Sequence, residues 1–90
     1  MNWTFAFTAH AVRQYKGLEL ELRRRIKGKL LFWESQNDPL NFSRAIPSFK
    51  TVTHRFRIGK YRIIVKAERE KKILTVVKIG PRNKVYNDLM

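Results

Sequence analysis

Hydrophobic and polar residues alternate in four stretches of this chain, and each alternation predicts a β-strand. In residues 2–7, aromatic side chains alternate with smaller or polar ones, which is the two-residue period of a strand. The same period returns in three later stretches, residues 52–58, 61–67 and 73–79. Short polar turns at residues 59–60 and 68–71 join these three stretches, so we expect them to form an antiparallel meander.

Helical spacing appears in the first third of the chain. Thr8 is a suitable N-cap for a helix over residues 9–16, and Gly17 is a suitable stop. A second helix is predicted over residues 18–34, because its apolar residues recur every three or four positions and share one stripe. That stripe consists of Leu22, Ile26, Leu30 and Trp33. Gly28 weakens this helix by roughly 1 kcal/mol relative to Ala.

The expected fold is therefore α+β, with the element order β-α-α-β-β-β. We expect a mainly antiparallel four-stranded sheet with the two N-terminal helices on one face, and Val12 and Tyr15 directed to the core. A loop is expected between the second helix and about residue 50. The 90 residues suit one domain spanning residues 1–90. The hydrophobic fraction of 43% is sufficient for one modest core.

The charge of the chain is strongly unbalanced. Twenty Lys and Arg residues against seven Asp and Glu residues give a formal net charge of +13. Such self-repulsion favours a partner that neutralises it, either nucleic acid or an acidic protein. The absence of Cys excludes disulfides and Cys-based zinc sites. With no basic n-region of a signal peptide and no apolar run longer than four residues, we expect a bacterial or archaeal cytoplasmic location.

Several cations occupy fixed positions on the predicted strands. The large apolar residues of residues 52–58 would face the helices, so Arg55 and Arg57 would face away from them. By the same parity, Arg62 of residues 61–67 faces away as well. Residues on one face of an antiparallel pair lie near one another. We therefore expect the three arginines to cluster around a space that suits an anion.

Phosphate fits such a cluster, because the planar guanidinium group binds it through two parallel hydrogen bonds. Arg82 and Tyr86 follow the last strand and are expected to reach the same face, where an aromatic ring offers a base a stacking surface. These features predict an RNA-binding surface. The cations expected to contact RNA are Arg55, Arg57, Lys60, Arg62, Lys66 and Lys84.

The chain lacks the residue sets of common hydrolases. Its two histidines lie on different elements, and we expect a surface position for His10 and a packed position for His54. No acidic cluster suits Mg²⁺ or Zn²⁺, and no glycine-rich loop suits a nucleotide, so neither a metal nor another cofactor is expected. If the protein is an enzyme, we expect it to act on phosphate without a metal, which RNA permits because its 2′-OH can attack the adjacent phosphate once the strand is aligned. Lys60, Lys66 and Lys84 are candidate proton acceptors.

Two segments, residues 56–64 and 79–86, resemble short patterns of the RelE/ParE superfamily of bacterial and archaeal toxins, more specifically its RelE-like branch. The resemblance covers almost the whole chain, including the order of its elements. It implies the toxin of a type II toxin–antitoxin system, a ribosome-dependent endoribonuclease that cuts mRNA in the A site and stops translation. The implied partners are an acidic RelB-like antitoxin, the 30S A site, rRNA and mRNA.

The resemblance also implies the catalytic residues. They are Arg55, Arg57, Arg62, Arg82 and Tyr86. Arg55 and Arg62 would stabilise the phosphate in the transition state. Arg82 would assist the leaving 5′-oxygen, and Tyr86 would stack on or orient the base. The best-known members carry Lys at the second-strand pair, where one Lys is thought to act as base. Here both residues are Arg, which is a poorer proton acceptor. Three alternatives follow: a neighbouring Lys or His54 acts as the base, the activity is weak, or alignment of the substrate supplies most of the catalysis.

Two other functions fit the sequence. A ParE-type relative would inhibit DNA gyrase without cutting RNA, although the retained Arg62, Arg82 and Tyr86 count against it. A non-catalytic RNA-binding protein, such as a small ribosomal component, fits the composition equally well, but the ordered sheet-face cluster fits it less.

Overall fold

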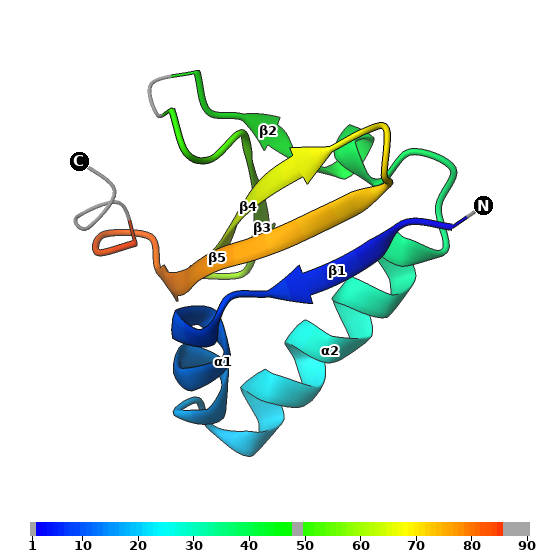
Figure 1. The fold of residues 1–90 in the computed structure, drawn as a ribbon. Coiled ribbons are helices and arrows are strands. Elements are labelled where there is room, and N and C mark those ends of the chain that lie inside the picture. The colour runs from blue at the N-terminus through cyan, green and yellow to red at the C-terminus, as the bar shows by residue number, and fades with distance from the viewer. Residues whose placement is uncertain (1, 48–49, 86–90) are drawn as a thin grey trace.

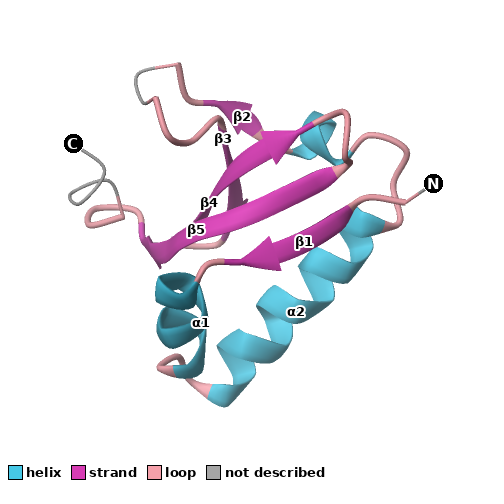
Figure 2. Ribbon diagram, in the orientation of Figure 1, coloured by secondary structure: helices cyan, strands magenta, loops and turns pink. Residues whose placement is uncertain are grey.

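Five strands form one sheet, and two helices cover one of its faces (Figures 1 and 2). The computed structural model describes residues 2–47 and 50–85. Its elements are β1 (Thr4–Phe7), α1 (Ala9–Lys16), α2 (Leu20–Glu34), the 3₁₀ helix η1 (Pro39–Phe42), β2 (Arg44–Ala45), β3 (His54–Ile58), β4 (Tyr61–Glu68) and β5 (Ile73–Pro81). The strand order is β1-β5-β4-β3-β2. β1 runs parallel to β5, and the other neighbours are antiparallel.

The predicted α+β class and the order of the predicted elements are confirmed, but the strand count was wrong. β2 lies in the segment that we expected to be a loop, and its Arg44 and Ala45 pair with Arg55 and His54 of β3. Two residues are too few to produce an alternating pattern, which is why the sequence did not reveal this strand. The helix α2 runs without a break through Gly28.

The helix α1 begins and ends where the sequence predicts. The Thr8 hydroxyl accepts a hydrogen bond from the Ala11 backbone N–H at 3.1 Å, as an N-cap should. Ala11 is the fully buried residue of this helix, whereas Val12 and Tyr15 are only half-buried. The Tyr15 hydroxyl donates to the Arg23 backbone carbonyl at 3.0 Å and so ties α1 to α2.

The main core lies between the helices and the sheet. Ile26, Leu30 and Trp33 of α2 belong to it, so the predicted stripe faces the sheet. Phe56 of β3 is fully buried, and its ring centroid lies 4.4 Å from that of Trp33 and 5.6 Å from that of Phe5. Tilted and edge-to-face aromatic contacts of this kind add to the stabilisation from burial alone. The helices are thereby fixed on one side of the sheet.

A second, smaller core covers part of the opposite face. It consists of Ile46, Val52, Ile64 and Val85, with Val77 packed against it. This face is therefore not open along its whole length, because residues 46 and 52 fold across it. The described segments contain no helix long and apolar enough to cross a lipid bilayer.

Candidate nucleic-acid interface

The β3–β4 hairpin brings arginines together on the sheet face that lies away from the helices. Arg57 is paired with Arg62 across the two strands, and Arg55 is paired with Ile64 of the small outer core. Gly59 and Lys60 form the tight turn between the strands. Gly59 has φ of 58°, a left-handed conformation that glycine adopts without the penalty other residues incur. This glycine therefore permits the two-residue turn that sets the arginine register.

One hollow, the strand hollow, lies over β2, β3 and β4. It has a volume of about 270 Å³ and is lined by Phe42, Arg44, Arg55, Arg57 and Arg62. Arg44 reaches it because β2 pairs Arg44 with Arg55. Four of its five lining side chains are thus guanidinium groups.

A second hollow, the turn hollow, lies where the hairpin turn meets the segment after β5. It has a volume of about 320 Å³ and is lined by Arg57, Gly59, Lys60, Arg62, Pro81, Arg82 and Asn83. The Arg82 backbone N–H donates to the Lys60 carbonyl at 2.9 Å, which fastens the post-β5 segment to the turn. Arg57 and Arg62 line both hollows, so the two form one continuous cationic region.

Arg62 is the most enclosed cation of this region, with a relative exposure of 6%. Its Nη1 donates hydrogen bonds to the backbone carbonyls of Gly59 and Tyr61, both at 3.3 Å. These bonds hold the guanidinium group at the junction of the two hollows. Arg57 and Arg82 are exposed, and Arg55 is half-buried. A rigid buried arginine flanked by accessible ones can bind an anion with little loss of side-chain entropy.

The charge in this region is of one sign. Among the described residues, no acidic side chain lines either hollow. Two ion pairs lie near the opposite end of β4, where Arg69 contacts Asp38 at 3.4 Å and Lys71 contacts Glu68 at 3.9 Å. Clustered guanidinium groups repel one another, and an anion between them relieves that repulsion. The geometry therefore suits the phosphates of a nucleic acid.

Two of the predicted site residues, Lys66 and Lys84, line neither of these hollows. Lys66 lies beyond Ile64 on β4 and lines neither hollow. Lys84 lines a separate hollow that includes Gln14 and Lys78. Tyr86 lies outside the described residues.

His54 does not face the arginines. It is paired with Val65, whose side chain belongs to the helix-side core, so its parity is opposite to that of Arg55. Its Nδ1 lies 2.8 Å from the Thr53 hydroxyl. Burial, and then the positive charge of Arg69, lower the pKa of His54 below 6.5, although the Asp38 carboxylate opposes this. A role for His54 as the base of a reaction at the arginines is therefore excluded by its position.

The sequence did not reveal Phe42 and Arg44 as members of the site. Their spacing of two is compatible with one face of an extended segment, but the run is too short to stand out. Their place becomes evident only from the pairing of Arg44 with Arg55. Within residues 2–47 and 50–85, no three His, Asp or Glu side chains come together in a way that suits a metal ion.

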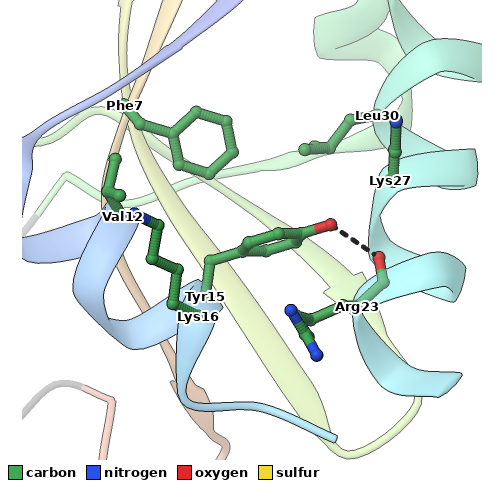
Figure 3. Close-up of a pocket in the computed structure, with 7 residues that line it drawn as sticks. All are labelled: Phe7, Val12, Tyr15, Lys16, Arg23, Lys27 and Leu30. Atoms are coloured by element: carbon green, nitrogen blue, oxygen red, sulfur yellow. Dashed lines mark hydrogen bonds between the residues drawn. The ribbon is translucent and has the colours of Figure 1, made fainter. Parts of the chain in front are cut away.

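A different hollow lies between α1 and α2, and its lining residues are drawn in Figure 3. It has a volume of about 460 Å³. Its lining combines an apolar set, Phe7, Val12, Tyr15 and Leu30, with a cationic set, Lys16, Arg23 and Lys27. The buried Nε of Arg23 has no hydrogen-bond partner within the part of the chain that the structure describes. We call this the interhelical hollow.

Comparison with solved structures identifies the fold. The toxin–antitoxin complex RelBE2 from Mycobacterium tuberculosis contains a chain similar to this one, with a TM-score of 0.78 and 18% identity over 91% of this chain and 100% of that chain. The archaeal RelE–RelB complex from Pyrococcus horikoshii OT3 gives a TM-score of 0.74 and 20% identity over 94% and 100% of the two chains.

An E. coli RelE toxin in the free state, with two arginines replaced by alanine, gives a TM-score of 0.74 and 17% identity, covering 99% of this chain and 95% of that chain. No protein-family model matches the sequence, and no curated protein sequence matches it significantly. The likeness is therefore one of backbone architecture, retained at low sequence identity. This chain has the fold of the RelE toxins.

Proposed function

We propose that this protein is the toxin of a type II toxin–antitoxin pair and acts as a ribosome-dependent endoribonuclease that cuts mRNA in the A site. The observation that carries the proposal is the continuous cationic region on a RelE fold, where Arg55, Arg57, Arg62 and Arg82 line two adjoining hollows. The arginines of these hollows can bind the phosphodiester group of RNA directly, without a metal ion. A cytoplasmic location follows from this proposal, because ribosomes are the site of action.

The proposed reaction is a transesterification within the RNA. The 2′-oxygen attacks the adjacent phosphorus, the bond from phosphorus to the 5′-oxygen breaks, and a 2′,3′-cyclic phosphate forms. Arg62 and Arg55 stabilise the negative charge that develops on the phosphoryl oxygens. Arg82 donates a hydrogen bond to the departing 5′-oxygen, which takes its proton from solvent, and Tyr86 orients the base. The fixed position of Arg62 supports its part, because its guanidinium is already held by two backbone carbonyls.

The proton of the 2′-OH needs an acceptor, and arginine is a poor one because it stays protonated. Of the three lysines considered from the sequence, Lys60 lines the turn hollow together with Arg62 and Arg82. We assign the acceptor role to Lys60 in its uncharged amine form, or to solvent at the same position. Arg57, which lines both hollows, then contributes to alignment of the strand rather than to proton transfer.

The proposed protein partner is an acidic antitoxin. The net charge of +13 favours rapid association with such a partner. The interhelical hollow offers it a docking place on the helix side, because apolar side chains lie beside the cations Lys16, Arg23 and Lys27. An amphipathic antitoxin segment with acidic residues beside an apolar one would fill it and supply an acceptor for the Arg23 Nε.

Binding of an acidic protein encoded next to this chain tests the partner. Reversing one charge in the hollow, Lys27→Glu, should raise the Kd of that complex, whereas Lys66→Glu changes the net charge equally outside this hollow. Equal weakening by both substitutions would mean that only overall charge matters.

The test of the enzymatic proposal is cleavage by purified protein of mRNA in a ribosome complex with a defined codon in an empty A site. The same mRNA free in solution and the Arg82→Ala variant serve as controls. We expect a cut within that codon on ribosomes only, and none with Arg82→Ala. If folded protein cuts neither substrate, the proposal is wrong, and supercoiling by DNA gyrase is the next activity to assay.

A further inference from the structure

The strand hollow contains one feature that phosphate binding does not explain, the aromatic ring of Phe42. This side chain is 47% exposed and lines the hollow beside four arginines. It belongs to a pair of adjoining exposed aromatic rings, and contiguous exposed apolar side chains mark interaction sites more often than single ones do. Phosphates need only the guanidinium groups. A ligand that combines a phosphate with a flat apolar group would use the whole hollow.

A second aromatic ring, that of Phe32, contacts Phe42. The Phe42 ring packs edge-to-face against Phe32 of α2, with centroids 5.6 Å apart and an interplanar angle of 79°. Phe32 is itself 48% exposed, so the two rings form an aromatic pair at the surface. Such edge-to-face pairs are favourable beyond the area that they bury. The contact with Phe32 therefore favours the observed position of the Phe42 ring at the strand hollow.

The backbone around Phe42 is also fixed. The Asp38 carboxylate caps η1 by accepting from the Leu40 N–H at 3.1 Å, and the Leu40 side chain is buried. The Ser43 hydroxyl and N–H both donate to the Leu40 carbonyl, at 2.8 and 3.1 Å. Arg44 then enters the sheet through its pairing with Arg55. The Phe42 ring and the Arg44 guanidinium group thus come from one segment that these hydrogen bonds and this pairing hold against β3.

We propose that Phe42 is a nucleobase-stacking residue and that the strand hollow holds a second nucleotide next to the one being cut. Arg44 binds its phosphate, and Phe42 stacks on its base. This inference rests on the proposed function, since it extends the same RNA site toward β2. Stacking on an aromatic ring accepts any base, so the contact strengthens binding of single-stranded RNA without selecting a sequence.

The test compares two ligands, a fluorescent six-nucleotide single-stranded RNA and the same strand with all bases removed. Affinities are measured by fluorescence anisotropy for the wild type, Phe42→Ala and Phe42→Tyr. Leu20→Ala is the matched control, because Leu20 is an apolar residue of similar exposure, 52%, at the far end of α2. Circular dichroism confirms that each variant is folded.

We expect Phe42→Ala to weaken binding of the intact RNA about 5- to 150-fold, which is the effect of one stacked base. Binding of the abasic strand should change by less than twofold, Phe42→Tyr should retain the preference for bases, and Leu20→Ala should behave as wild type. An equal loss on both strands, no loss on either, or absence of RNA binding by the wild type would overturn the inference. Contact of the Phe32–Phe42 pair with a protein instead would appear as one of the first two outcomes.

The ribosome assay separates this inference from the function on which it rests. A wild-type protein with a Phe42-dependent preference for bases but no cleavage would remove the proposed enzyme and leave the stacking contact. Cleavage and RNA binding that are both unaffected by Phe42→Ala would leave the enzyme and remove the contact.

Discussion

The two faces of the sheet differ in what they bury. The helix face carries the main core, in which aromatic rings from β1, α2 and β3 pack against one another. The outer face has a core of four residues, and beside it the sheet carries arginines. Neighbouring residues of one strand therefore differ in their surroundings. Phe56 is fully buried in the core, whereas Arg57 is exposed on the outer face. Burial therefore stabilises the fold mainly at the helix face, and the outer face can carry side chains of like charge.

The largest expected effect is the loss of stability when the helix face is damaged. Phe56→Ala should lower the free energy of unfolding by about 3–5 kcal/mol, because it leaves a cavity next to Trp33 and Phe5. Arg57→Ala, one position along, should change it by no more than about 0.5 kcal/mol. Urea denaturation followed by circular dichroism measures both. Similar losses of unfolding free energy in the two variants would mean that the two faces contribute equally to stability.

The next effect concerns catalysis at the outer face. Arg62→Ala should reduce ribosome-dependent cleavage about 10²- to 10³-fold, the typical cost of removing one donor that stabilises a developing anion. The cleavage rate of Arg62→Lys should lie between those of the wild type and Arg62→Ala, because an ammonium group keeps the positive charge but lacks the planar fork of the guanidinium group. His54→Gln is the control on the opposite face and should cut at the wild-type rate. Normal cleavage by folded Arg62→Ala protein would remove Arg62 from the site.

A smaller effect should appear in the salt dependence of RNA binding. Each phosphate contact with single-stranded RNA contributes about −0.7 to the slope of log K against log salt concentration. Arg44→Ala should therefore make the slope shallower by about 0.7, whereas Lys16→Ala, at the interhelical hollow, should leave it unchanged. Anisotropy titrations at several salt concentrations give the slopes. Equal changes for the two variants would mean that RNA does not distinguish the faces.

The smallest effect is the pH dependence contributed by His54. Its pKa in the folded protein is lowered, chiefly by burial, so the unfolded chain binds a proton more readily. Stability from this residue is present above pH 6.5 and is lost as the pH falls from there toward the folded pKa. His54→Gln should flatten this part of the stability profile measured by denaturation. Cleavage by that variant should keep the wild-type pH profile, and a shifted profile would contradict the placement of His54.

Much of this arrangement was predictable from the sequence, because it depends on strand parity and local chemistry. The alternation around Phe56 correctly assigned Arg55, Arg57 and Arg62 to one face, and Thr8 correctly marked the start of α1. These assignments need only neighbouring residues, so no knowledge of the tertiary fold was required.

The parts that the sequence did not reveal depend on contacts between distant segments. Arg44 and Phe42 join the site through one short strand pairing, which leaves no periodic signal. The small outer core forms because Ile46, Val52 and Val85 converge on Ile64 from three segments. Lys66 and Lys84 have suitable charge, but the intervening outer core and the turn after β5 keep them from the arginine hollows.

In the proposed function, RNA is held and cut at the outer face of the sheet. The most direct measurement compares ribosome-dependent cleavage by Arg57→Glu and Lys27→Glu, two folded variants whose net charge is reduced equally on opposite faces. We predict that Arg57→Glu abolishes cleavage and that Lys27→Glu cuts within a few-fold of wild type. Equal loss in the two variants would contradict the account, as would full activity of Arg57→Glu.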